Sequence, residues 1–226
     1  MPIRPTGVTE RPDAVLFDCD GTLADTEPIS DRAWQDVLAG YGYTMTSQDV
    51  ASVVGQPFAV SYAHYATKVD LADPARIRGQ LRERFLARFE TEMSLHRDAV
   101  DTLRSLVTDG VPVAVVSSSG REHVDRVLRW GELTAAVPLL VTAEDVDEHK
   151  PAPEPYLLAA SRLGVDPTGC TVVEDTSVGI ASGLAAGCFV VGVRRAHNDA
   201  SSLTAAHRVV DEVTAGSLTH ASSGAS

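Results

Sequence analysis

The sequence predicts an α/β fold in which a parallel β-sheet carries helices on both of its faces. Short runs rich in valine and leucine recur along the chain, and each is apolar on both faces, as is typical of strands buried in a parallel sheet. Segments with the periodicity of amphipathic helices lie between these runs. Apolar residues make up 44% and charged residues 22% of the 226 residues, so the composition is that of a globular protein with a buried core.

Five runs are predicted as the strands of this sheet, and glycines end two of the helices between them. One helix carries Leu103, Leu106 and Val107 on its apolar face and ends near Gly110. The next helix has a similar face and ends near Gly131. The predicted strands are residues 14–17, 113–116, 139–141, 171–173 and 190–193.

The spacing of the strands predicts an inserted second domain. The later strands follow one another closely, whereas the gap between the first and the second is far longer than a single crossover helix needs. Residues 28–94 have a helical pattern throughout, so we expect a small all-helical domain there, inserted into a core formed by residues 11–27 and 95–213. The small polar residues at 1–10 and 214–226 predict flexible termini.

The charge and the cysteine content argue against several classes of protein. The chain has 31 acidic and 19 basic residues, a formal net charge of −12, and no cluster of lysine and arginine of the kind that binds nucleic acid or anionic lipid. No apolar stretch approaches the roughly 18 residues that span a bilayer, and Met1 to Arg11 lack the apolar run of a secretory signal. Because the three cysteines are odd in number and unlike a zinc site, we expect a reduced, cytoplasmic protein. We further expect a monomer or weak homodimer with no nucleic-acid or membrane partner.

Two pairs of acidic residues follow predicted strands. Asp18 and Asp20 end the first strand, and alternate residues of an extended chain point the same way. Glu174 and Asp175 end the fourth strand. A single acid at such a place usually caps a turn or a helix. Two acids together at the carboxyl end of a strand, where open α/β sheets bind ligands, favour a functional site.

Hydroxyl groups and a lysine lie at the ends of other predicted strands. Ser117 and Ser118 begin a serine-rich turn after the second strand, which could cap a helix or could hold an anion with its hydroxyls and free amides. Lys150 lies in a proline-rich helix start, where a solvated side chain is common. Lysine is rare in this chain, however, because only Lys68 and Lys150 are lysines among its 19 basic residues.

Together these residues predict phosphoryl transfer. Carboxylates gathered at one sheet edge repel one another by about 4 kcal/mol per pair at 4 Å and an effective dielectric of 20. The cluster therefore predicts a divalent cation, and ligands that are all oxygen suit Mg²⁺. A lysine and hydroxyls beside the acids suit a phosphate dianion. A carboxylate nucleophile, a second carboxyl for proton transfer, a metal and a phosphate cradle are typical of transfer through an aspartyl phosphate.

The same motifs resemble those of the haloacid dehalogenase-like hydrolase superfamily. DCDGTLAD, a hydroxyl after the second strand, KPAPEPY and VVEDTSVGI occur in that family's order within residues 12–195. They are most similar to the branch that contains β-phosphoglucomutase and phosphoglycolate phosphatase. The resemblance implies a Rossmann-like core with an inserted all-helical cap domain that closes over the substrate.

The resemblance also implies a role for each candidate residue. Asp18 would be the nucleophile, and Asp20 would protonate the leaving oxygen and then take a proton from water. The implied phosphate-binding residues are Ser117, Ser118 and Lys150. The implied Mg²⁺ ligands are Asp18, the backbone carbonyl of Asp20, Asp175 and, directly or through an intervening group, Glu174.

We therefore predict a Mg²⁺-dependent phosphatase for a small phosphorylated metabolite such as a sugar or sugar-acid phosphate. A phosphomutase like β-phosphoglucomutase is the alternative, although the nearest match to that enzyme's Gly-x-x-Arg element, at residues 54–58, has no arginine. A non-enzymatic receiver-like domain that accepts a phosphoryl group is a further alternative, which the chain length and the insertion disfavour.

Residues that could select the substrate are sought in the inserted domain. Gln56, His64 and Lys68 are the candidates, although packing or a solvated surface is the commoner role for each residue type. Trp34 is predicted to lie in the core of the inserted domain, on its helical face. His123 and His207 show no ligand spacing and are predicted at the surface.

Overall fold

The chain divides into two compact units. The computed structural model describes residues 9–53, 58–198 and 200–221. One unit joins Met1–Ala24 to Leu95–Ser226, and the other is the continuous segment Asp25–Ser94. The inserted domain predicted from the spacing of the strands is residues 28–94. We refer to the first as the core unit and to the second as the helical unit.

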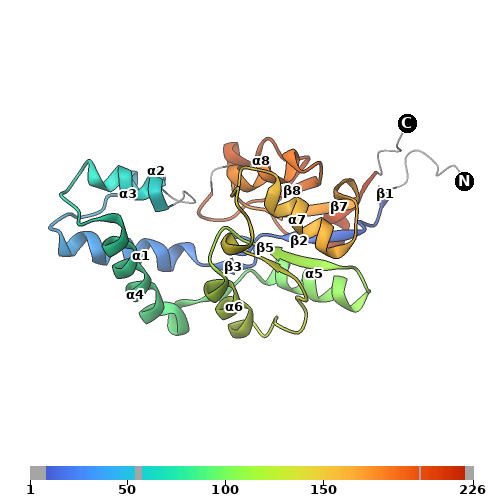
Figure 1. The fold of residues 1–226 in the computed structure, drawn as a ribbon, viewed down its shortest axis with the longest axis horizontal. Helices are drawn as coiled ribbons and strands as arrows, with labels where there is room; N and C mark the ends of the chain where they lie inside the picture. The colour runs from blue at the N-terminus through green and yellow to red at the C-terminus, as the bar shows by residue number, and fades with distance from the viewer. Residues whose placement is uncertain (1–8, 54–57, 199, 222–226) are drawn as a thin grey trace, which may run out of the picture. The chain divides into compact units, whose positions relative to one another are not determined.

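The core unit is built on a six-stranded parallel sheet, which confirms the predicted α/β fold (Figure 1). The strand order is β6-β5-β2-β7-β8-β9, with β2 in the interior between β5 and β7. In register, Val15 of β2 lies opposite Val113 of β5 and Thr171 of β7. The strands are β2 (Ala14–Phe17), β5 (Val113–Val116), β6 (Leu140–Val141), β7 (Cys170–Glu174), β8 (Phe189–Val193) and β9 (Arg208–Val210).

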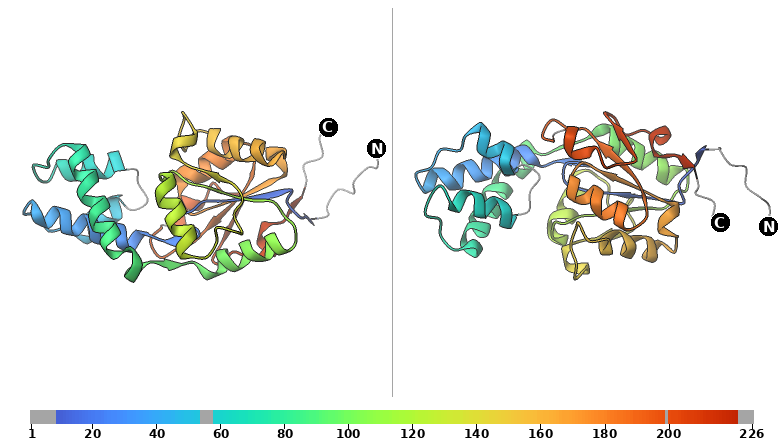
Figure 2. Two further views of the ribbon diagram at one scale, coloured as in Figure 1. Left: turned by 60° about the horizontal axis from the view of Figure 1, so that its bottom comes forward. Right: turned by 90° about the horizontal axis from the view of Figure 1, so that it is seen from above.

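Helices cover both faces of this sheet (Figure 1 and Figure 2). The side chains of Ala14 and Leu16 on β2 share a buried cluster with Tyr156 and Ala159 of α7 and with Ile180 of α8. Helix α5 packs on the opposite face. The helices of the core unit are α5 (Arg97–Thr108), α6 (Arg121–Trp130), α7 (Glu154–Leu163) and α8 (Ser177–Ala185), with short 3₁₀ turns at Ala143–Asp145, Pro167–Gly169, Ala200–Leu203 and Ala215–Leu218.

The segment 214–221, which we expected to be flexible, is folded against the core unit. Strand β10 (His220–Ala221) pairs antiparallel with β1 (Thr9–Glu10). Leu218 is fully buried, and its carbonyl oxygen accepts a hydrogen bond of 2.9 Å from the hydroxyl of Thr171. One apolar anchor among small polar residues produces no periodic pattern, so the expectation of a flexible tail was wrong for this segment.

In the described part of the helical unit, four helices pack around an aromatic and aliphatic core of the unit's own. Trp34 is 9% exposed and contacts the ring of Tyr65 at a centroid distance of 4.9 Å, so its predicted place in this core is confirmed. The helices are α1 (Glu27–Gly40), α2 (Ser47–Val53), α3 (Phe58–Ala66) and α4 (Pro74–Glu92). The short strands β3 (Ala24–Asp25) and β4 (Ser94–Leu95), at the two ends of the unit, pair with each other.

Candidate active site

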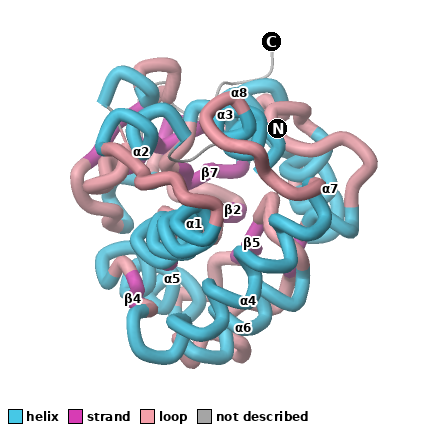
Figure 3. The backbone as a smooth tube through the Cα atoms, turned by 90° about the vertical axis from the view of Figure 1, so that its left-hand side faces the viewer, coloured by secondary structure: helices cyan, strands magenta, loops and turns pink. Residues whose placement is uncertain are grey.

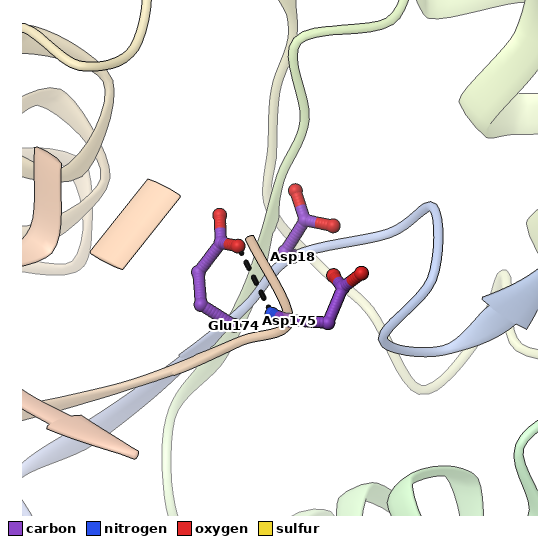
Figure 4. Close-up of side chains that lie close together, drawn as sticks. All are labelled: Asp18, Glu174 and Asp175. Atoms are coloured by element: carbon purple, nitrogen blue, oxygen red, sulfur yellow. Dashed lines mark hydrogen bonds between the residues drawn. The ribbon is translucent and has the colours of Figure 1, made fainter. Parts of the chain in front are cut away.

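Strands β2 and β7 are neighbours in the sheet (Figure 3). Three carboxylates gather where these two strands end (Figure 4). Asp18 follows β2 directly, Glu174 is the last residue of β7 and Asp175 follows it. Each offers a carboxylate oxygen, and these three oxygens lie within 4.8 Å of one another. The side chains are 10%, 0% and 2% exposed, in the same order. Three buried acids this close together fit a cation bound by oxygen ligands.

Lys150 binds this group of acids. Its Nζ donates to Oδ1 of Asp18 at 2.7 Å and to Oε1 of Glu174 at 2.7 Å, and also to the carbonyl oxygen of Val116 at 2.9 Å. The side chain is only 4% exposed. Burial disfavours its charge, but the carboxylates of Asp18 and Glu174 outweigh this and raise the pKa of Lys150 well above 10.5. The two carboxylates therefore favour the ammonium form of Lys150 beside Asp18.

The carboxylate of Glu174 accepts five hydrogen bonds. Oε1 accepts from Lys150 and from the hydroxyl of Tyr156, while Oε2 accepts from the amides of Asp175 and Thr176 and from the hydroxyl of Thr176. A Cβ at Gly179 would lie 1.6 Å from Oε1, so only glycine leaves room at this point of α8. Glu174 is thus held rigidly, and it in turn holds Lys150.

Asp175 is held by two different elements. Its Oδ1 accepts from the hydroxyl of Thr22 at 2.9 Å, and its Oδ2 lies 2.8 Å from Nε2 of His197. Burial raises the pKa of Asp175, and the hydrogen bond with His197 opposes that effect. Gly21 has a φ of +84°, and a Cβ there would lie 2.2 Å from Oδ2 of Asp175, so the turn after β2 approaches this carboxylate as only glycine can.

Asp18 has the least compensated carboxylate of the three. Burial raises its pKa well above 3.8, the ammonium of Lys150 lowers it, and the neighbouring Glu174 and Asp175 raise it further. Asp18 and Glu174 therefore share one lysine, while Asp175 pairs with His197. A bound cation would supply the missing positive charge, and the oxygen ligands present suit a hard divalent ion.

Asp20 lies apart from this group and is held by the segment that follows β5. Its Oδ2 accepts from the hydroxyl of Ser119 at 2.7 Å and from that of Ser117 at 3.4 Å. Its Oδ1 lies 2.7 Å from Nε2 of His123 on α6. The structure thus places the side chains of Asp20 and Ser117 close together at one edge of the sheet. Ser118, between the two serines that contact Asp20, is exposed.

The prediction that His123 is a surface residue was wrong. Its side chain is only 25% exposed and is paired with Asp20. Burial lowers the pKa of His123, but the carboxylate of Asp20 outweighs it and raises the pKa above 6.5. The pattern of the sequence did not reveal this contact, because the two residues are 103 positions apart and one histidine on a helix has no characteristic spacing. Further contacts that the sequence did not reveal are those of Thr22, Ser119, Tyr156 and His197.

The candidates for substrate selection in the helical unit have different surroundings. His64 pairs within the unit with Asp49, at 2.9 Å, so its ring is part of the packing. Lys68 is exposed. Gln56 and the rest of residues 54–57 lie outside the described residues. His207 is exposed, as predicted, and its ring stacks on Phe189. Within the described residues, no helix combines the length and apolar character needed to cross a membrane.

A curated relative has a known phosphatase activity. The chain is 36% identical over 194 residues to the fructose-1-phosphate phosphatase YqaB of Escherichia coli, an alignment that covers 82% of this chain and 98% of the relative. The alignment therefore spans nearly the whole relative and about four fifths of this chain.

Two solved structures share the fold. A HAD family hydrolase from Deinococcus radiodurans R1, with bound phosphate and sodium, is 34% identical with a TM-score of 0.74, over 94% of this chain and 100% of that one. The β-phosphoglucomutase of Clostridium difficile is 22% identical with a TM-score of 0.73, over 88% and 91% of the two chains, which shows the likeness of the fold.

The family model described as haloacid dehalogenase-like hydrolase matches residues 15–193. This range contains the three clustered carboxylates, Lys150 and Asp20. The chain therefore belongs to the haloacid dehalogenase-like hydrolase family, and with its phosphatase relatives it is an enzyme of the phosphoric monoester hydrolase type.

Proposed function

We propose that the chain is a Mg²⁺-dependent phosphatase that hydrolyses a small phosphorylated metabolite, a sugar or sugar-acid phosphate, through an aspartyl phosphate. The observation that carries the proposal is the buried pairing of Asp18 with Lys150 inside a group of three carboxylates. A structural ion pair is complete without two further buried acids. A nucleophilic carboxylate that works beside a bound cation needs such acids to hold the cation. The fructose-1-phosphate phosphatase relative supports the sugar phosphate class.

Asp18 is the proposed nucleophile. Lys150 donates to Oδ1 of Asp18, so we assign the attack on phosphorus to Oδ2. The new bond between Asp18 and phosphorus forms as the bond between phosphorus and the substrate oxygen breaks, and Asp20 gives its proton to that oxygen. In the second step Asp20 takes a proton from water, whose oxygen attacks phosphorus and releases inorganic phosphate and free Asp18.

The proposed Mg²⁺ ligands are Asp18, Asp175 and the backbone carbonyl of Asp20. When bound, the ion would polarise the phosphoryl group and offset the charge of the carboxylates. Both oxygens of Glu174 already accept hydrogen bonds, five in all, so we assign Glu174 to the positioning of Lys150.

The proposed phosphate-binding groups are Ser117, Ser118 and Lys150. Ser117 is 5% exposed and Ser118 is exposed, so the two hydroxyls serve at different depths of the turn after β5. We assign the choice of substrate, and the exclusion of water during the first step, to the helical unit acting as a cap. We further propose that the enzyme works in the cytoplasm as a monomer or weak homodimer, since its three cysteines are free thiols.

A panel of phosphorylated metabolites tests the proposal. Release of inorganic phosphate is measured for hexose phosphates, pentose phosphates, sugar-alcohol phosphates and phosphoglycolate, with Mg²⁺ and with a chelator. We expect turnover of at least one sugar or sugar-acid phosphate, its loss in the chelator and its recovery with added Mg²⁺. Asp18→Asn is expected to be inactive, and retained turnover in that variant would overturn the aspartyl phosphate mechanism.

The same assay distinguishes the two alternatives. Interconversion of hexose phosphates without release of phosphate would favour a phosphomutase. Incorporation of a single phosphoryl group without turnover would favour a receiver-like domain.

A further inference from the structure

We propose that His123 is a positioning residue that fixes the carboxyl group of Asp20 for proton transfer to and from the reacting oxygens. The inference deepens the proposed function, because it rests on the role of Asp20 as general acid and base. His123 acts through Asp20 and is not assigned any contact with the substrate.

The geometry that carries the inference is a clamp on both oxygens of Asp20. Nε2 of His123 lies 2.7 Å from Oδ1, and the hydroxyl of Ser119 donates to Oδ2 at 2.7 Å. Ser117 is a weaker partner, because its hydroxyl lies 3.4 Å from Oδ2 and also accepts the amide of Ser119 at 3.0 Å. Among these three contacts, those with His123 and Ser119 are the closer ones, and together they hold both oxygens of the carboxyl group.

The backbone at Asp20 explains why such a clamp is needed. Asp20 lies beyond the end of β2 and immediately before the turn at Gly21, so the sheet does not restrain its side chain. The terminal torsion of an aspartate is broad, and an unrestrained carboxyl group rotates freely. His123 itself is well placed to restrain it, because the neighbouring Val124 and Val127 anchor α6 in the core.

The clamp acts on the side chain of Asp20 and is separate from the contacts of Lys150, whereas the Mg²⁺ ligand assigned to Asp20 is its backbone carbonyl. Lys150 contacts Asp18 and Glu174, while His123 contacts Asp20. The side chains of His123 and Asp20 are 25% and 24% exposed, so Asp20 remains accessible to a leaving oxygen while it is held. Loss of His123 is therefore expected to impair proton transfer while leaving nucleophilic attack and phosphate binding intact.

The test compares two substrates that differ in their need for an acid. A sugar phosphate must receive a proton on its leaving oxygen, whereas a nitrophenyl phosphate releases a stable anion without one. For His123→Ala we expect kcat on the sugar phosphate to fall about 10- to 100-fold with KM within about threefold of wild type. On nitrophenyl phosphate we follow the first step alone, by release of the nitrophenolate in a single turnover, because the second step uses Asp20 as a base with either substrate. We expect this rate to change by less than about threefold.

Three further variants give the test its controls. His123→Gln keeps an amide nitrogen near the position of Nε2 and is expected to recover most of the lost rate on the sugar phosphate. Asp20→Asn is expected to show the same dependence on leaving group more strongly, and adding His123→Ala to it is expected to cause no further loss. Arg129→Ala changes an exposed residue of the same helix and is expected to match wild type on both substrates.

Several outcomes would overturn the inference. These are an equal loss on both substrates, no loss on either, a rise in KM alone, or additive losses in the double variant. Retained activity on nitrophenyl phosphate also shows that His123→Ala is folded, so a selective loss supports the inference. The proposed function fails separately, if Asp18→Asn keeps its turnover or wild type hydrolyses no monoester.

Discussion

Two buried aspartates, Asp18 in the core unit and Asp49 in the helical unit, differ in how their charge is satisfied. Asp49 is 3% exposed and accepts hydrogen bonds from the amide and the hydroxyl of Thr46 and from Tyr43, and it also pairs with His64. The hydroxyl of Thr46 and these other partners lower its pKa. The whole Asp18 residue is 7% exposed. Its carboxylate shares one lysine with Glu174, lies close to Asp175 and has a raised pKa because of burial.

Hydrogen-bond donors distinguish a carboxylate with a structural role from one with a role in catalysis. Burial alone does not separate the two residues, since both are nearly inaccessible. The supply of donors does separate them. A carboxylate surrounded by donors is stable as it is, whereas one crowded by other acids requires a cation and keeps an oxygen free for chemistry.

The largest expected effect is that of Asp18→Asn. We expect turnover to fall by a factor on the order of 10⁴ or more, because the nucleophile is lost. The free energy of unfolding should fall by no more than about 1 kcal/mol, because the substitution removes one of three crowded negative charges. Initial rates of phosphate release and urea unfolding measure the two quantities. A large loss of stability would contradict the comparison, since it would mean that Asp18 resembles Asp49.

The next effect concerns the metal. Mg²⁺ should raise the thermal unfolding temperature of the wild type, because it binds only the folded group of acids. In Asp175→Asn the Mg²⁺ concentration needed for that shift should rise at least about tenfold. Asp49→Asn is the matched control, because it changes a buried aspartate that has its own donors. An unchanged Mg²⁺ response in Asp175→Asn would exclude Asp175 as a ligand.

Asp49→Ala tests the other side of the comparison. Removal of this carboxylate leaves the donors of Tyr43 and Thr46 and the ring of His64 without their partner inside the helical unit. We expect a loss of about 3 kcal/mol in the free energy of unfolding, measured in urea, and a normal response of the unfolding temperature to Mg²⁺. A loss below about 0.5 kcal/mol would show that these donors find other partners.

The sequence was sufficient to predict the interior of the sheet. The strands β2 and β5 have the predicted limits, because their residues are apolar on both faces and the pattern is unambiguous. Strand β9 was not predicted, because it lies at the sheet edge, is only half buried and contributes only two apolar residues, Val209 and Val210. Edge strands depend on pairing with a neighbour more than on their own composition.

For the candidate site, too, only the part that depends on the strands could be predicted from the sequence. The four acids lie at or just beyond the ends of β2 and β7, so the parallel sheet alone brings them to one edge. They are Asp18, Asp20, Glu174 and Asp175. The partners that hold them were not predicted when they come from helices or distant loops, as His123 and His197 do. Which helical residue contacts the edge depends on side-chain packing, for which the sequence has no periodic signal.

The last prediction concerns a smaller effect, the dependence of stability on pH. It tests whether the pKa of a buried acid depends on its hydrogen-bond donors or on the unit in which the acid lies. Asp145 belongs to the core unit; burial favours a higher pKa, but hydrogen bonds from Thr142 and the guanidinium of Arg162 lower the pKa from 3.8 to about 2. Because the folded pKa is the lower one, its stabilisation is complete above pH 3.8 and is lost as the pH falls towards 2. We expect Asp145→Asn to reduce stability by about 1 to 2 kcal/mol at pH 6 and by progressively less in acid, as measured by urea unfolding at each pH. A deficit that stays constant down to pH 2 would mean that donors do not lower this pKa, and the contrast between Asp18 and Asp49 would then need a cause other than donor supply.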